Sequence, residues 1–162
     1  MRQASSGFTL VELMVVIVLI GVLASMVHIS LGDNNARNAR QEADVLLSLM
    51  HGLREKAVLD GQEYGLRIEP GAYQLMRFER DRWQAVDTRV PLPFGLVLGL
   101  TLDGQTQPLV PLADMPQLLW LSSDESTAFS LHFDSPPQRW RSIVSDGFGD
   151  PEIEIPESAN EG

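Results

Sequence analysis

The chain has 162 residues, of which 44% are hydrophobic and 21% charged, so it is long and apolar enough to bury a core. It contains no cysteine, which excludes disulfides, thiolate metal sites and cysteine nucleophiles. The formal net charge is −10, and residues 101–162 carry eleven acidic and two basic side chains, so the chain repels phosphate backbones and is not expected to bind nucleic acid.

Residues 8–31 form an apolar run that contains one carboxylate, Glu12, and one imidazole, His28. A helix of this length extends about 36 Å, and the hydrocarbon layer of a bilayer is about 30 Å thick. We therefore expect a transmembrane helix over residues 8–31. A core helix and a cleaved secretory signal are the alternatives. The run is longer than the roughly 7–15 apolar residues of a signal peptide, and Arg2 is the only base before it.

A polar leader of seven residues precedes the run, and residues 7–13 read GFTLVEL. This motif closely resembles the processing site of type IV pilins and type II secretion pseudopilins. The resemblance implies that residues 1–7 are a leader peptide, which prepilin peptidase removes by cutting after Gly7. It further implies that the same enzyme methylates the new amine of Phe8, and that the apolar helix stays on the mature chain.

Glu12 is the ionisable group of this motif, and a charge near mid-membrane costs about 2.5–3.5 kcal/mol. Cleavage after Gly7 would create a cationic amine on Phe8, four residues before Glu12. The two charges can neutralise one another within a subunit or between neighbouring subunits, and the alternative is a carboxylate that reaches the lipid headgroups. The resemblance implies the role between subunits, in which Glu12 sets the register of assembly.

Residues 32–35, which read GDNN, break the apolar run, and a membrane exit with a helix restart can lie there, but residues 8–60 together predict one long helix. Residues 32–61 are then the periplasmic continuation of the helix, up to a stop signal at Asp60-Gly61. Their apolar residues recur at intervals of three and four, which predicts one stripe. The stripe consists of Ala36, Ala39, Ala43, Leu46, Met50, Leu53 and Ala57. We expect it to pack against the chain's own domain, with a coiled-coil seam as the alternative.

From residue 62 onward, short alternating stretches between turn signals predict β-strands. The expected strands cover residues 64–68, 73–78, 83–86, 96–102, 118–121, 129–134 and 139–144. The proline-rich residues 108–116 predict a loop that crosses between sheets, and Trp140 is an expected core anchor. The fold class is therefore α+β: a long N-terminal helix, transmembrane in its first half, packed on a small antiparallel β-sandwich over residues 62–162 with an acidic C-terminal tail.

Catalytic motifs are missing from the sequence, including GxSxG, HExxH, the phosphate loop and the dinucleotide fingerprint. Ser130, His132 and Asp134 share one face of an expected strand, but side chains that all point one way do not position one another as a triad. The tail acids Asp146, Asp150, Glu152 and Glu154 offer oxygen ligands for calcium without an EF-hand spacing. We expect a solvated tail, no metal, no cofactor and no enzyme activity.

The C-terminal half carries a second resemblance. Residues 121–129 (LSSDESTAF), Trp140 and residues 146–149 (DGFG) are similar to the minor pseudopilins of the H type, although Asp124 stands where glycine is common. The resemblance implies a structural and assembly subunit of the short periplasmic filament that exports folded proteins through the type II secretion system.

The same resemblance implies a single-pass protein of the bacterial inner membrane with its C-terminal domain in the periplasm. The implied partners are prepilin peptidase, the other major and minor pseudopilins and the inner-membrane secretion platform. Two alternatives stay open. One is a minor pilin of type IV pili, against which the lack of a C-terminal cysteine pair counts. The other is a membrane-anchored periplasmic binding module.

Overall fold

The computed structural model describes residues 10–109 and 115–156, and the side chains in these ranges except those of residues 24–33. The chain divides into two compact units, Met1–Asn34 and Asn35–Gly162, which are described separately. The residues that carry the expected processing site, Gly7 and Phe8, lie outside the described ranges. So do residues 110–114 of the expected proline-rich loop and the last six residues of the expected acidic tail.

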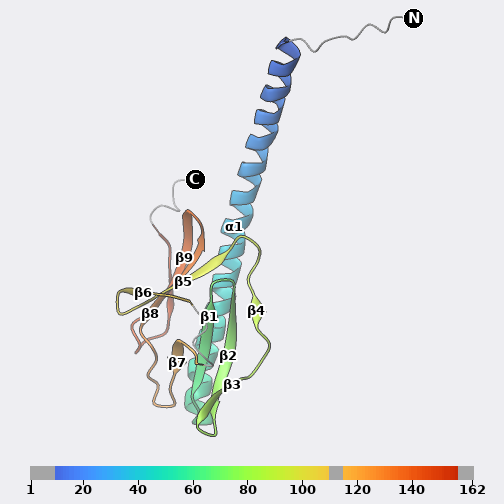
Figure 1. The fold of residues 1–162 in the computed structure, drawn as a ribbon. Coiled ribbons are helices and arrows are strands. Elements are labelled where there is room, and N and C mark those ends of the chain that lie inside the picture. Colours follow the sequence, from blue (N-terminus) through green and yellow to red (C-terminus); the bar gives the residue numbers. More distant parts are fainter. Residues whose placement is uncertain (1–9, 110–114, 157–162) are drawn as a thin grey trace, which may run out of the picture. The chain divides into compact units, whose positions relative to one another are not determined.

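One helix, α1, spans Leu10–Asp60 (Figure 1). It continues through residues 32–35 without a restart, as expected for one long helix over residues 8–60, of which residues 10–60 are described. Gly, Asp and Asn each cost about 1 kcal/mol or less inside a helix, and helical residues on both sides carry the helix through them. Within the described side chains, no helix has a stretch both long and apolar enough to cross a bilayer. The side chains of residues 8–9 and 24–31, which belong to the expected span, lie outside that description.

Within its described residues, the second unit contains two antiparallel sheets, which together with α1 confirm the α+β class (Figure 1). The first sheet has the order β3-β2-β1-β7, with β4 paired to β2. Its strands are β1 (Tyr64–Glu69), β2 (Ala72–Glu79), β3 (Arg82–Ala85), β4 (Val90–Pro91) and β7 (Leu118–Trp120). The second sheet has the order β10-β9-β8-β5-β6. Its strands are β5 (Val97–Leu102), β6 (Gln105–Gln107), β8 (Phe129–Ser135), β9 (Gln138–Ser145) and β10 (Glu152–Glu154).

All seven expected strands occur, within two residues at each end, and β4, β6 and β10 are additional. β10 lies in the segment that we expected to be a solvated acidic tail. Its backbone pairs with β9, where Glu152 lies opposite Val144 and Glu154 opposite Ser142. The two glutamates are exposed while Ile153 between them is half-buried, so the strand adds to the sheet without burying a charge.

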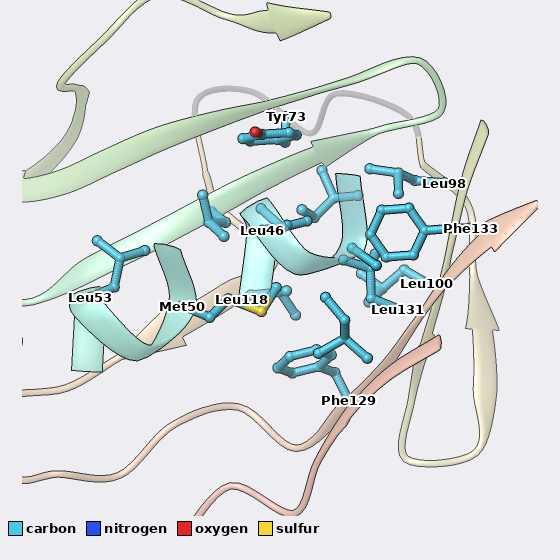
Figure 2. Packing of buried hydrophobic residues seen from close by; sticks show 14 of the residues in the cluster. Leu46, Met50, Leu53, Tyr73, Leu98, Leu100, Leu118, Phe129, Leu131 and Phe133 are labelled. Carbon is cyan, nitrogen blue, oxygen red and sulfur yellow. The ribbon is translucent and has the colours of Figure 1, made fainter. Parts of the chain in front are cut away.

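A single core joins the second half of α1 to both sheets. Its helix residues are Ala39, Ala43, Leu46, Met50, Leu53 and Ala57, all buried. Figure 2 shows Leu46 and Met50 pointing toward side chains of the sheets, among them Tyr73 of β2 and Leu131 of β8. The stripe therefore packs against the chain's own domain as expected, although Ala36 at its start is only half-buried.

Trp140 is not the core anchor that the sequence suggested. It is half-buried at the edge of the core, whereas Trp120 on β7 is 1% exposed. Trp140 lies at a register shift between β8 and β9: Arg141 pairs with Phe133 and Arg139 with Asp134, which leaves Trp140 as the extra residue of a β-bulge. A bulge bends its strand and re-aims the side chain, and strand alternation in the sequence does not reveal it.

Leu46→Ala is expected to lower the free energy of unfolding by about 2–5 kcal/mol, because it leaves a cavity in a packed core. Val45→Ala is the matched control, since Val45 is the neighbouring residue on α1 and is exposed. It should change stability by about 0.5 kcal/mol or less. Urea unfolding followed by circular dichroism measures both, and equal effects would contradict the placement of the stripe in the core.

Candidate functional site

Three functional residues are expected near the N-terminus, namely Gly7, Phe8 and Glu12, and of these the structure describes Glu12. It lies in the first turn of α1 with an exposed side chain. A carboxylate is favoured there because the unpaired backbone N–H groups give the start of a helix a partial positive charge.

A cluster of polar contacts in the second unit surrounds Arg54, near the end of α1. The guanidinium binds Asp124 through two parallel hydrogen bonds, from Nε to Oδ1 and from Nη2 to Oδ2, each 2.9 Å long. Its Nη1 donates to Oδ1 of Asp150 at 2.7 Å, and Nη2 also donates to the carbonyl oxygen of Phe148 at 2.8 Å. We call Arg54, Asp124, Phe148 and Asp150 the Arg54 cluster. One helix side chain thus holds two turns that are far apart in the sequence.

The first of these turns explains why Asp124 stands where glycine is common. Asp124 has a φ of +72°, in the left-handed region that favours glycine. The turn is closed by hydrogen bonds from the Asp124 N–H to the Leu121 carbonyl, at 3.1 Å, and from the Leu121 N–H to the Glu125 carbonyl, at 2.9 Å. Asp tolerates this conformation better than most residues, and here its carboxylate gains the paired bonds to Arg54.

The second turn contains the motif DGFG of residues 146–149. Oδ1 of Asp146 accepts the N–H groups of Phe148 and Gly149, both at 2.9 Å. These bonds to the charged carboxylate, the one from Gly149 first, hold the pKa of Asp146 below its ordinary value. Gly147 has a φ of +89°, and a Cβ atom there would lie 2.8 Å from the carbonyl oxygen of Ser126. The motif therefore builds a tight turn against the first one.

The charged groups of the Arg54 cluster are bonded to one another. Hydrogen bonds to Asp124 and then to Asp150 raise the pKa of Arg54, so the guanidinium stays charged and transfers no proton. The surface hollow beside it is lined also by His51, whose Nε2 lies 3.0 Å from the Pro151 carbonyl oxygen. Leu59 and Phe148 are each 75% exposed here. An exposed aromatic ring on a turn fixed by ion pairs suits contact with another protein.

Ser130, His132 and Asp134 do not form a triad, as expected. His132 contacts residues of the neighbouring strands instead, with Nδ1 2.9 Å from Oγ of Ser142 and Nε2 3.2 Å from Oγ1 of Thr101. Burial lowers the pKa of His132. The Asp134 carboxylate accepts a hydrogen bond from Nε of Arg139 at 3.0 Å.

The sequence analysis did not predict the Arg54 cluster. Arg54 lies 70 residues from Asp124 and 96 from Asp150, and no local pattern reports such a contact. Two features of the sequence pointed to the turns of this cluster: Asp124 stands where glycine is common, and residues 146–149 form the DGFG motif. Of the four acids considered for calcium, Asp146 and Asp150 have the partners described above. Glu152 and Glu154 lie exposed on β10.

Arg54→Ala should destabilise the protein by about 1–2 kcal/mol, because it removes hydrogen bonds between charged groups at a partly screened surface. Arg54→Lys should fall between, since an ammonium cannot make the paired bonds to Asp124. Arg40→Ala, an exposed arginine of the same helix, serves as the control. Thermal unfolding separates the three, and an Arg54→Ala midpoint equal to that of Arg40→Ala would show that the cluster contributes nothing.

The chain is similar to known proteins in sequence. The family described as Prokaryotic N-terminal methylation motif matches residues 2–27. The chain is 42% identical to "Type II secretion system protein H" of Pseudomonas aeruginosa over 171 aligned positions, which cover 94% of this chain and 98% of the relative. It is 35% identical to the protein of the same description from Aeromonas hydrophila, over 64% of this chain and 61% of that one.

Solved structures with a similar fold carry descriptions that match those of the sequence relatives. The minor pseudopilin EpsH from the Type 2 Secretion System of Vibrio cholerae superposes with a TM-score of 0.65 and 25% identity, over 74% of this chain and 97% of that one. The solution structure of E. coli GspH gives a TM-score of 0.62 at 17% identity, over 77% of this chain and 93% of that one, and shares the fold. A fimbrial protein of Pseudomonas aeruginosa is 38% identical, but over only 38% of this chain.

Proposed function

The chain belongs to the family of type II secretion system protein H, and from that premise we propose that it is a minor pseudopilin, a structural and assembly subunit of the periplasmic pseudopilus. This filament drives the export of folded proteins through the type II secretion system. The observation that carries the proposal is the 42% identity over 98% of a curated protein H. Identity of that extent covers the globular domain as well as the N-terminal motif.

The proposal includes processing at the N-terminus. Residues 1–7 are a leader peptide, prepilin peptidase cuts after Gly7, and the amine of Phe8 is methylated. The match of residues 2–27 to the methylation motif supports this, since that range contains the whole sequence GFTLVEL.

The mature chain is anchored in the inner membrane by one span over residues 8–31. The continuation of the helix over 32–61 and the β-rich domain over 62–162 lie in the periplasm. The support is the apolar run, with Glu12 as its one carboxylate, together with the family.

Glu12 serves assembly in this proposal. Its carboxylate pairs with the amine of Phe8 on a neighbouring subunit, which offsets the cost of placing either charge in a low-dielectric setting. The partners are the other major and minor pseudopilins and the inner-membrane secretion platform. The chain itself is a substrate of prepilin peptidase and not an enzyme. The Arg54 cluster fits that assignment, because its ionic groups are engaged in holding two turns.

The second candidate is a minor pilin of type IV pili, favoured by the similarity to a fimbrial protein. Complementation distinguishes the two. In a bacterium whose own gene for protein H has been deleted, this chain should restore release of a reporter exoprotein. In a strain that lacks a minor pilin, it should not restore pili. Restored pili without restored secretion would overturn the main assignment.

A further inference from the structure

We propose that the end of the second unit next to the membrane exit binds the lipid surface of the inner membrane, with Phe94 lying in the headgroup layer while the subunit is held in the bilayer. This inference rests on the proposed span over residues 8–31 and extends it to the folded domain. Phe94 is 97% exposed, so its ring contributes almost nothing to the core. Single exposed apolar side chains are common, and the argument therefore depends on where this one lies and how it is held.

The residue next to Phe94, Gly95, lies against Asn35, where the second unit begins. A Cβ atom on Gly95 would lie 3.3 Å from Oδ1 of Asn35, the first residue of the second unit. Figure 1 shows the connection between β4 and β5 passing beside α1. The expected span ends at Leu31, four residues before Asn35, which is about 6 Å along a helix. In this proposal, residues 32–34 alone separate the span from Asn35, so a short segment of chain joins the loop that carries Phe94 to the membrane.

The loop is a built structure that turns Phe94 outward. The N–H of Leu92 donates to the Gly71 carbonyl at 2.9 Å, and the N–H of Leu96 donates to the Pro93 carbonyl at 3.2 Å. Leu96, two residues after Phe94, is 3% exposed and anchors the loop in the core. Because Gly95 adopts a φ of +85°, the chain reverses between the buried leucine and the exposed ring.

A second loop lies at the same end of the unit. Nδ2 of Asn35 donates a hydrogen bond to Oγ of Ser135 at 2.8 Å, which ties the β8–β9 connection to the start of the helix. Pro136 and Pro137 of that connection are exposed. Residues 91–95 carry no charged side chain, so this loop can approach lipid without desolvating an ion. Pro136 and Pro137 line a surface hollow together with the ion pair of Asp134 and Arg139.

Two exposed arginines of α1, Arg37 and Arg40, are available for this contact, and residues 31–44 also carry the acids Asp33, Glu42 and Asp44. Arginines just beyond a span are attracted to the phosphates of anionic lipids. The carboxylates of Asp124 and Asp150 instead gather at Arg54, 19 residues beyond Asn35 and so about 28 Å further along α1.

The absence of cysteine makes the test direct, because each introduced cysteine is a unique labelling site. The full chain is reconstituted in vesicles of phosphatidylethanolamine and phosphatidylglycerol that contain a lipid with a nitroxide near the headgroup. An environment-sensitive fluorophore is placed at Phe94→Cys or, as the matched control, at Phe148→Cys, the exposed phenylalanine of the Arg54 cluster. The label at 94 should shift to the blue and lose most of its emission, while the label at 148 should keep its emission.

Two further variants separate the possible failures. A label at Leu19→Cys, within the expected span, should be quenched by nitroxides deep in the acyl chains; if it is not, the proposed span and this inference both fail. If it is quenched while the labels at 94 and 148 behave alike, only this inference fails.

A label at Pro137→Cys tests the second loop, and it should lose much of its quenching when Phe94→Ser is added. Shielding of the label at 94 only after other pseudopilins are supplied would assign this end to a subunit interface and overturn the lipid contact.

Discussion

Gly7→Val is expected to leave the chain at its full precursor length in the inner membrane, without a methyl group on Phe8. Glycine has no Cβ atom, so an extended backbone can enter a tight protease site at this position, and a branched side chain should block it. The loss of methylation should be close to complete, because a chain that keeps its leader has no free amine at Phe8. Mass spectrometry of the chain extracted from membranes measures cleavage and methylation together.

Ser6→Ala is the control for Gly7→Val, since it changes the neighbouring residue without adding bulk. It should be cut and methylated like the wild type. A mature N-terminus at Phe8 in Gly7→Val would show that the steric account of Gly7 is wrong. Secretion of a reporter exoprotein should fall in Gly7→Val together with cleavage, because the filament requires the processed chain.

Glu12→Ala should separate two steps that Gly7→Val blocks together. Insertion in the bilayer should be unchanged or easier, because a costly charge is removed, and cleavage should proceed because the scissile bond is five residues upstream. Docking should fail, since the Phe8 amine of a neighbouring subunit loses its counter-charge in a low-dielectric setting. We expect normal cleavage and membrane level, weak cross-linking to other pseudopilins and reduced secretion.

Glu12→Asp gives the graded control, because it keeps the carboxylate and shortens the side chain by one methylene. It should fall between the wild type and Glu12→Ala in cross-linking and in secretion. If Glu12→Ala assembles and secretes like the wild type, the role of Glu12 between subunits is wrong, and a carboxylate that reaches the headgroups is the better account. That result would also fit a subunit at the filament tip, which has no neighbour above it.

The helix and its buried face were predictable because an amphipathic helix repeats its apolar residues every three to four positions. Six of the seven stripe residues are buried as that spacing predicts. The long strands were predictable for a similar reason, since Phe129, Leu131 and Phe133 alternate with polar residues and point into the core. Local periodicity therefore identified the main elements and most of the core.

The short edge strands and the Arg54 cluster were not predictable in this way. β4 has two residues and β10 three, which is too short for an alternating pattern, and both form because a neighbouring strand offers its backbone. Arg54 reads as one more solvated charge on a helix until the turns that contain Asp124 and Asp150 are brought to it. The sequence resemblance marked both turns, but only the folded chain shows that one guanidinium joins them.

The Arg54 cluster has a consequence for how the domain is held closed in the periplasm. That compartment is oxidising, and small exported domains there often restrain their loops with disulfides. This chain has no cysteine, and Arg54 instead closes loops of 70 and 96 residues through ionic contacts. Unlike a disulfide, these contacts break when the domain opens, so they stabilise the folded state without restraining the unfolded chain. The contacts of Arg54 therefore form and break without an oxidase or an isomerase. They weaken when the ionic strength rises, whereas reductants do not affect them.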